Sequence, residues 1–174
     1  VAEPTALSAS ISGTNLLCNG DKSGSAIVTT TGGTSPYSFL WSNGATSSTV
    51  SNLASGTYTV IVLDNNSCKV TASVALTEPT AISLITTTTG ANCGNSDGKA
   101  SVSASGGTPS YTYKWSNGQT NKSISNLSSG TYKVTVKDAN GCKTIGTAAV
   151  TDNQGPTVSV TSTSVSCTGG SDGT

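Results

Sequence analysis

Apolar and small polar residues alternate along short stretches of this chain, and Gly, Asn, Asp and Pro residues separate these stretches. The clearest example is residues 56–63, in which Tyr58, Val60 and Val62 fall on alternate positions. A period of two places such residues on one face of a β-strand, and no stretch has the period of a helix. Further strands are expected at residues 6–12, 25–31, 36–41, 48–53 and 68–77. The pattern therefore predicts an all-β fold.

The same succession of elements occurs a second time, 74 residues later. The landmarks that share this offset are Trp41 and Trp115, Tyr58 and Tyr132, and Cys68 and Cys142. A fixed period of this size is typical of tandem modules. The tripeptide Glu-Pro-Thr at residues 3–5 recurs at residues 78–80 and marks a boundary. We expect one domain in residues 1–78, a second in residues 79–155 and the start of a third in residues 156–174, as part of a longer protein.

Aromatic residues gather on the strand expected at residues 36–41 and its repeat, where they fall two positions apart. Such a row places the rings on one face, and large rings usually fill a core. The residues expected in the two cores are Tyr37, Trp41, Tyr58, Tyr111, Trp115 and Tyr132. The alternative is that the rows bind sugars. Asn43-Gly44 follows the row and predicts a tight hairpin. Short strands and such turns predict an immunoglobulin-like β-sandwich for each unit, and short linkers predict a stiff, elongated array.

Charge is sparse, because charged residues make up 9% of the chain and the net charge is zero. Nucleic-acid binding needs a concentrated basic patch, which this sequence lacks. No apolar run approaches the ~20 residues of a membrane-spanning helix. The chain has no His, so a serine nucleophile would have no imidazole base. We expect neither an enzyme, a nucleic-acid partner nor membrane insertion.

The five cysteines indicate an oxidising compartment, since no Cys-x-x-Cys pair is present to suggest zinc. Two cysteines per unit favour the pairs Cys18–Cys68 and Cys93–Cys142, and a closed loop of this length stabilises by roughly 4 kcal/mol. The number of strands between the cysteines decides the pairing. An even number places both at one end of the sandwich, whereas an odd number would let Cys18 reach Cys142 of the next unit.

Acidic residues recur in the loops beside the cysteines, as Asp21 and Asp97 after the first and Asp64 and Asp138 before the second. Calcium needs six to eight oxygen ligands, and one carboxylate per loop falls short of that. The favoured interpretation is that these residues form turns through side-chain hydrogen bonds, with calcium as the alternative. No other cofactor is expected.

Several motifs in a fixed order resemble the SprB-type repeat of large surface adhesins of gliding Bacteroidetes. They are Cys-x-Gly, Gly-Gly-Thr-x-x-Tyr, Trp-Ser-Asn-Gly, Ser-Asn-Leu-x-x-Gly-Thr-Tyr and Asp-x-Asn-Gly-Cys. The resemblance implies export to the cell surface and a role in adhesion or gliding. The function expected is a structural stalk that spaces or displays adhesive regions, with neighbouring repeats of the same chain as its partners. The alternative is a module that binds surface polysaccharide or another substratum.

Overall fold

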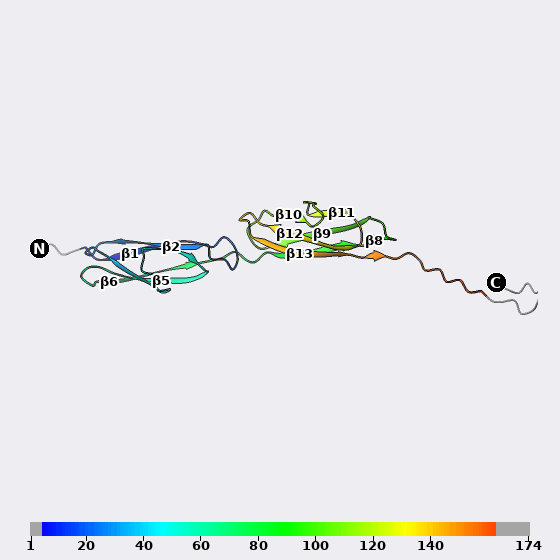
Figure 1. Ribbon diagram of the computed structural model, residues 1–174. Helices are drawn as coiled ribbons and strands as arrows, with labels where there is room; N and C mark the ends of the chain where they lie inside the picture. The colour runs from blue at the N-terminus through cyan, green and yellow to red at the C-terminus, as the bar shows by residue number, and fades with distance from the viewer. Residues whose placement is uncertain (1–4, 163–174) are drawn as a thin grey trace, which may run out of the picture.

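The computed structural model describes residues 5–162, and these residues form strands and loops without a helix. The strands make two modules that lie end to end (Figure 1). Within the described residues no helix could cross a membrane. The last part of the third unit expected from the sequence, including Cys167, lies outside the described residues, and residues 156–162 contain no strand.

The first module consists of two three-stranded antiparallel sheets. One sheet has the order β1-β2-β4 and comprises β1 (Ser8–Thr14), β2 (Gly24–Thr31) and β4 (Thr49–Leu53). The other has the order β3-β5-β6 and comprises β3 (Ser38–Trp41), β5 (Gly56–Leu63) and β6 (Lys69–Leu76). The inner faces of the two sheets supply one shared cluster of buried residues.

The second module repeats this arrangement with its own cluster of buried residues. Its first sheet contains β7 (Ser83–Thr89), β9 (Gly98–Ser105) and β11 (Ser123–Leu127). Its second sheet contains β10 (Thr112–Trp115), β12 (Gly130–Lys137) and β13 (Lys143–Val150). A short parallel pair, β8 (Ala91–Asn92) with β14 (Asp152–Asn153), is added at one end.

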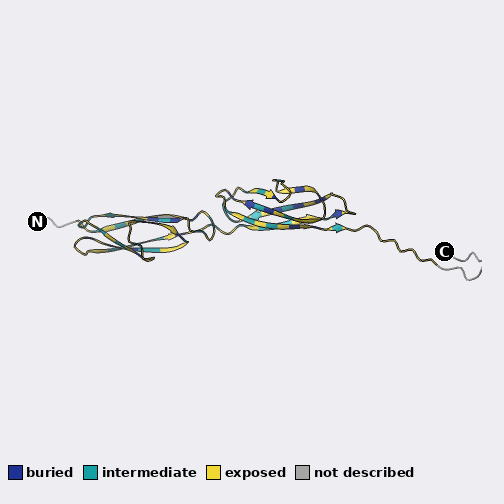
Figure 2. Ribbon diagram, in the orientation of Figure 1, coloured by how far each residue is buried: buried dark blue, intermediate teal, exposed yellow. Residues whose placement is uncertain are grey.

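The core of each module is built on the alternation seen in the sequence, with buried positions on the inner faces of the strands (Figure 2). Val60 and Val62 on β5 are fully buried, and the Trp41 and Trp115 side chains are each 2% exposed. A buried indole N–H needs an acceptor. Trp41 Nε1 donates to the Ser47 carbonyl at 2.7 Å, and Trp115 Nε1 makes the equivalent bond in the second module.

The strand order identifies the kind of sandwich. In immunoglobulin domains strands A, B, E and D form one sheet, of which A, B and E have counterparts here, strands C, F and G form the other, and strand C carries a buried tryptophan. The orders β1-β2-β4 and β3-β5-β6 reproduce this arrangement, with Trp41 on β3. The Tyr58 hydroxyl, near the start of β5, donates to the Ala54 carbonyl at 3.1 Å, as in the tyrosine corner of that fold. The predicted all-β, immunoglobulin-like class is confirmed.

The predicted hairpin at Asn43-Gly44 is wrong. The turn itself forms, because the Gly44 amide donates to the Trp41 carbonyl at 2.9 Å. However, β3 and β4 belong to different sheets, so the turn starts a crossing from one sheet to the other. β3 is antiparallel to β5 and β4 is antiparallel to β2. β2 and β5 run in the same direction, because Gly33 after β2 meets Asp64 after β5. β3 and β4 therefore also run in one direction. Together they cross the module once and do not reverse the chain.

Candidate functional site: the joint between the modules

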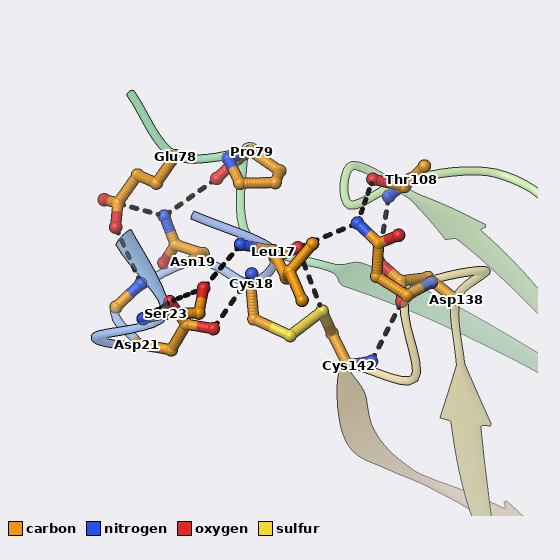
Figure 3. Close-up of a disulfide and its surroundings, with 12 residues drawn as sticks. Leu17, Cys18, Asn19, Asp21, Ser23, Glu78, Pro79, Thr108, Asp138 and Cys142 are labelled. Carbon is orange, nitrogen blue, oxygen red and sulfur yellow. Dashed lines mark hydrogen bonds between the residues drawn. A yellow bond between two sulfur atoms is a disulfide. The ribbon is translucent and has the colours of Figure 1, made fainter. Parts of the chain in front are cut away.

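A disulfide between Cys18 and Cys142 joins the two modules (Figure 3). Cys18 lies in the loop after β1, and Cys142 lies just before β13. The two Cα atoms are 5.6 Å apart, a normal separation for this bond. The favoured pairs Cys18–Cys68 and Cys93–Cys142 are wrong for this structure, which contains the alternative pair and leaves Cys68 and Cys93 as exposed thiols.

The physical reason is the direction of the strands. Gly24, Leu53 and Leu76 approach one another at the end of the first module where Cys18 lies. Gly33 and Asp64 meet at the opposite end, where Cys68 follows β5. An eight-residue strand spans about 26 Å, far beyond the reach of a disulfide. Four strands separate the two cysteines, but β3 and β4 make a single traverse, so the effective count is odd.

Asp138 shapes the loop that presents Cys142. Its carboxylate accepts three backbone N–H bonds, from Thr108 at 2.9 Å, Asn140 at 3.0 Å and Cys142 at 2.9 Å. The side chain is 6% exposed, so these donors supply the partners that a buried carboxylate requires. Gly107 has φ of +61° and turns the chain so that the next amide faces the carboxylate. Asp138 thereby fixes the cysteine at the end of the module.

Asn140 connects this loop to the other module. Its side-chain amide donates to the Leu17 carbonyl at 3.0 Å and to Thr108 Oγ1 at 3.1 Å. The Cys142 sulfur lies 3.4 Å from the same Leu17 oxygen. Because a disulfide sulfur carries no hydrogen, this approach is a contact and not a hydrogen bond. One carbonyl of the first module is therefore the meeting point for two groups of the second.

The opposite side of the joint is the loop after β1. Asp21 accepts backbone N–H bonds from Ser23 at 3.1 Å and Cys18 at 3.2 Å, and these bonds, that of Ser23 first, hold the pKa of Asp21 below its ordinary value. Glu78 binds the same loop from the linker, because it accepts from the Gly20 amide at 2.8 Å and from Asn19 Nδ2 at 3.1 Å. The linker and the cysteine loop thus form one hydrogen-bonded unit.

The joint is polar and loosely filled. The two buried clusters are separate, so no apolar core crosses between the modules. A cavity of about 230 Å³ lies beside the disulfide, with Cys18, Pro79, Ile82, Asp138 and Cys142 among its lining residues. In the absence of a shared core, the disulfide, the Asn140 contact and the hydrogen-bonded linker connect the modules.

The four aspartates considered for calcium all accept N–H bonds. Asp64 repeats the bonds of Asp138, with Thr34, Asn66 and Cys68 as donors at 2.8–2.9 Å. The Thr34 amide is the first cause of its lowered pKa. Asp97 accepts from the Asn92 amide at 2.8 Å, which likewise lowers the pKa of Asp97. Amide hydrogens aimed at a carboxylate favour the turn-forming interpretation. Residues 5–162 contain no cluster of three acidic, Cys or His residues suited to a metal, and calcium remains the untested alternative to the turn-forming role.

The aromatic rows lie against the cores. The two tryptophans are buried, and the four tyrosines expected beside them pack against the clusters as partly buried residues: Tyr37, Tyr58, Tyr111 and Tyr132. The hydroxyl of Tyr37 donates to the Gly32 carbonyl at 2.7 Å, and Tyr111 bonds to Gly106 in the same way. Rings held in this way support the neighbouring Gly-Gly-Thr turn and leave little of the row for a sugar.

Sequence reasoning missed Asn140 and Glu78 as joint residues. Both lie in motifs that the repeat had marked, since Asn140 belongs to Asp-x-Asn-Gly-Cys and Glu78 to Glu-Pro-Thr. The sequence did offer a signal, because the motif of Asn140 recurs beside a cysteine and that of Glu78 recurs at a module boundary. The contact itself could be found only after the two loops were known to face each other.

Known proteins were compared with this chain by sequence, by structure and by family. A comparison with curated proteins finds no match. Among solved structures, the amphioxus IgVJ-C2 molecule is similar at 14% sequence identity and a TM-score of 0.32, with 68% of this chain and 90% of that chain covered.

The model of the SprB repeat family matches residues 10–46 and residues 85–120. Each segment covers the first strands of one module and the cysteine loop between them. The resemblance read from the motifs is thereby confirmed, and one segment in each module matches the SprB repeat.

Proposed function

We propose that this chain is a load-bearing spacer of a repetitive cell-surface adhesin, in which it holds adhesive regions away from the cell during attachment or gliding. The SprB repeat is associated with cell-surface proteins, which supports an extracellular location. The observation that carries the mechanical role is the disulfide across the joint. A spacer must keep its modules aligned under load, and a covalent bond at a polar joint serves that purpose.

The path of force through the chain strengthens the proposal. Tension applied to the two ends passes along β1 to Cys18, through the disulfide to Cys142, and out along β13. The strands between the two cysteines then carry no covalent tension. The two cysteines have a sequence separation of 124, and the chain between them would extend by about 430 Å at roughly 3.5 Å per residue if it were free to unravel.

Single-molecule stretching between the chain ends tests this role. The oxidised chain should show no extension from the bypassed segment, and addition of dithiothreitol should release about 430 Å of new length. The Cys18→Ser, Cys142→Ser double variant should release the same length without reductant. Equal extension in oxidised and reduced chains would contradict the proposal. Specific binding of the isolated chain on a glycan array, with unchanged mechanics after reduction, would instead favour the polysaccharide-binding alternative.

A further inference from the structure

The two exposed thiols occupy the outer ends of the pair of modules. Cys68 lies at the end of the first module that faces away from the joint, and Cys93 lies at the far end of the second. Because they lie at opposite ends of the pair of modules, they cannot pair within one chain. Each corresponds to one half of the disulfide already described, since Cys68 is the counterpart of Cys142 and Cys93 the counterpart of Cys18.

The Cys68 loop reproduces the geometry of the Cys142 loop. Asp64 binds the Cys68 amide at 2.8 Å, as Asp138 binds that of Cys142 at 2.9 Å. The turn residues Ser67 and Gly141 both have positive φ, of 63° and 84°. The chain therefore forms this loop without any neighbour in contact with it, which indicates a preformed half of a joint.

Asn66 is an independent sign that the Cys68 loop is shaped for a partner. Its amide donates to Thr34 Oγ1 at 3.1 Å, which matches the bond from Asn140 to Thr108. At the existing joint Asn140 makes one further bond, to the Leu17 carbonyl across the interface. Asn66 thus already makes the bond within its own module, and its side chain is placed to make the bond across a joint as Asn140 does.

The Cys93 loop is held by its own exit segment, as the Cys18 loop is. Asp152 accepts from the Gly94 amide at 3.0 Å, where Glu78 accepts from Gly20. The Cys93 sulfur lies 3.2 Å from the position that a Cβ atom on Gly155 would occupy. Glycine at this position leaves that side of the thiol uncovered.

We propose that Cys93 and Cys68 are covalent docking sites for further copies of this module. Cys93 of one copy would bond to the Cys68-type cysteine of the next, so that every joint has both a peptide linker and a disulfide. Formation of the bond converts two thiols to one disulfide by exchange with a disulfide reagent. With oxidised glutathione, the two protein thiols are oxidised and two molecules of reduced glutathione leave. The inference rests on the geometry of the joint and does not require the mechanical function.

The test uses the chain with Cys167→Ser, isolated as a monomer whose Cys18–Cys142 bond is verified by peptide mapping. Incubation with oxidised glutathione at high protein concentration should give a ladder of disulfide-linked oligomers on non-reducing gels. Mass spectrometry should find the mixed Cys68–Cys93 peptide above the share that random pairing predicts. Cys68→Ser and Cys93→Ser should each abolish the ladder and leave at most dimers.

A matched variant separates docking from chance collision of thiols. Asn66→Ala should lower the share of the mixed peptide, because the contact that orients the two loops is lost, while both thiols remain equally reactive with iodoacetamide. Random proportions of the three possible peptides, or glutathionylated monomers alone, would overturn the inference. Neither result would affect the force-extension test of the mechanical role, so the two proposals can fail separately.

Discussion

The loops that carry Cys18 and Cys93 occupy equivalent places in the two modules and share a carboxylate contact from the exit segment, but they differ in the backbone pairing beside it. After the second module, Asp152–Asn153 pairs in parallel with Ala91–Asn92, and the Cys93 amide donates to the Asn153 carbonyl at 3.0 Å. After the first module, Pro79 stands where Asn153 stands later, and proline has no N–H to contribute to a ladder. One backbone bond remains there, from the Leu16 amide to the Thr77 carbonyl at 3.0 Å, and a side chain replaces the next, since Asn19 Nδ2 donates to the Pro79 carbonyl at 3.1 Å.

We attribute this difference to the exit segment, in which Pro79 takes the place of Asn153. A backbone ladder fixes the Cys93 loop through its own main chain. Glu78 and Asn19 instead tie the Cys18 loop to the linker, so the orientation of the linker and the position of the cysteine are coupled. The disulfide that forms at Cys18 joins the modules at the point where the linker is already anchored.

Removal of the joint disulfide should have the largest effect. The bond closes a loop with a sequence separation of 124, which corresponds to about 5 kcal/mol in the chain-entropy model. Cys18→Ser with Cys142→Ser should therefore lower the unfolding temperature by about 10 °C or more, measured by calorimetry. Cys68→Ser with Cys93→Ser is the matched control and should leave it unchanged. An equal effect of both pairs would show that the joint bond has no special role.

Asp138→Ala should have the next largest effect. The change leaves the Thr108, Asn140 and Cys142 amides without their acceptor, and the loss of three partly buried bonds of this kind costs about 3 kcal/mol together. Chemical denaturation should show this loss. Asp64→Ala removes the same bonds from the first module, so its cost should be similar. Only Asp138→Ala should also make the Cys18–Cys142 bond easier to reduce. Identical redox behaviour of the two variants would contradict the role of Asp138 in positioning Cys142.

Much of the fold could be predicted because it depends on local pattern. Alternation at Tyr58, Val60 and Val62 gave the strand and its buried face, and the buried Trp41 follows from the same rule. The pairing of the cysteines could not be predicted in this way, because it depends on whether β3 and β4 reverse the chain. Asn43-Gly44 makes a tight turn in either case, and only the packing of the two sheets decides where the chain goes next.

Asn140→Ala tests the non-covalent part of the joint. Loss of the bond to the Leu17 carbonyl should cost about 1 kcal/mol, which corresponds to a roughly fivefold shift in the equilibrium for reduction of the disulfide. Titration with dithiothreitol redox buffers measures that shift. Asn66→Ala removes the corresponding bond within the first module and should leave the equilibrium at the joint unaltered. A shift of equal size in both variants would indicate a general effect on stability.

Asn153→Pro should make the exit of the second module resemble that of the first. Proline at position 153 has no N–H, so the parallel pairing of β14 with β8 is weakened and the free energy of unfolding falls by about 1 kcal/mol. The Cys93 loop then becomes more mobile. The Cys93 thiol should then react faster with iodoacetamide. Asn153→Ala keeps the N–H but loses the side-chain bond to Asn92, so it isolates the contribution of the ladder. Unchanged reactivity in the proline variant would show that the ladder does not fix this loop.

Acid should have the smallest effect and should act on both cysteine loops. Amide donors, from Ser23 for Asp21 and Asn92 for Asp97, hold the pKa of each carboxyl below its ordinary value of 3.8. A lowered pKa means that the stability each carboxylate contributes is fully present above about pH 4 and declines as the pH falls through the folded-state pKa. NMR titration of the Asp side chains should show both midpoints below 3.8. Midpoints at or above that value would mean that these hydrogen bonds do not hold the loops in solution.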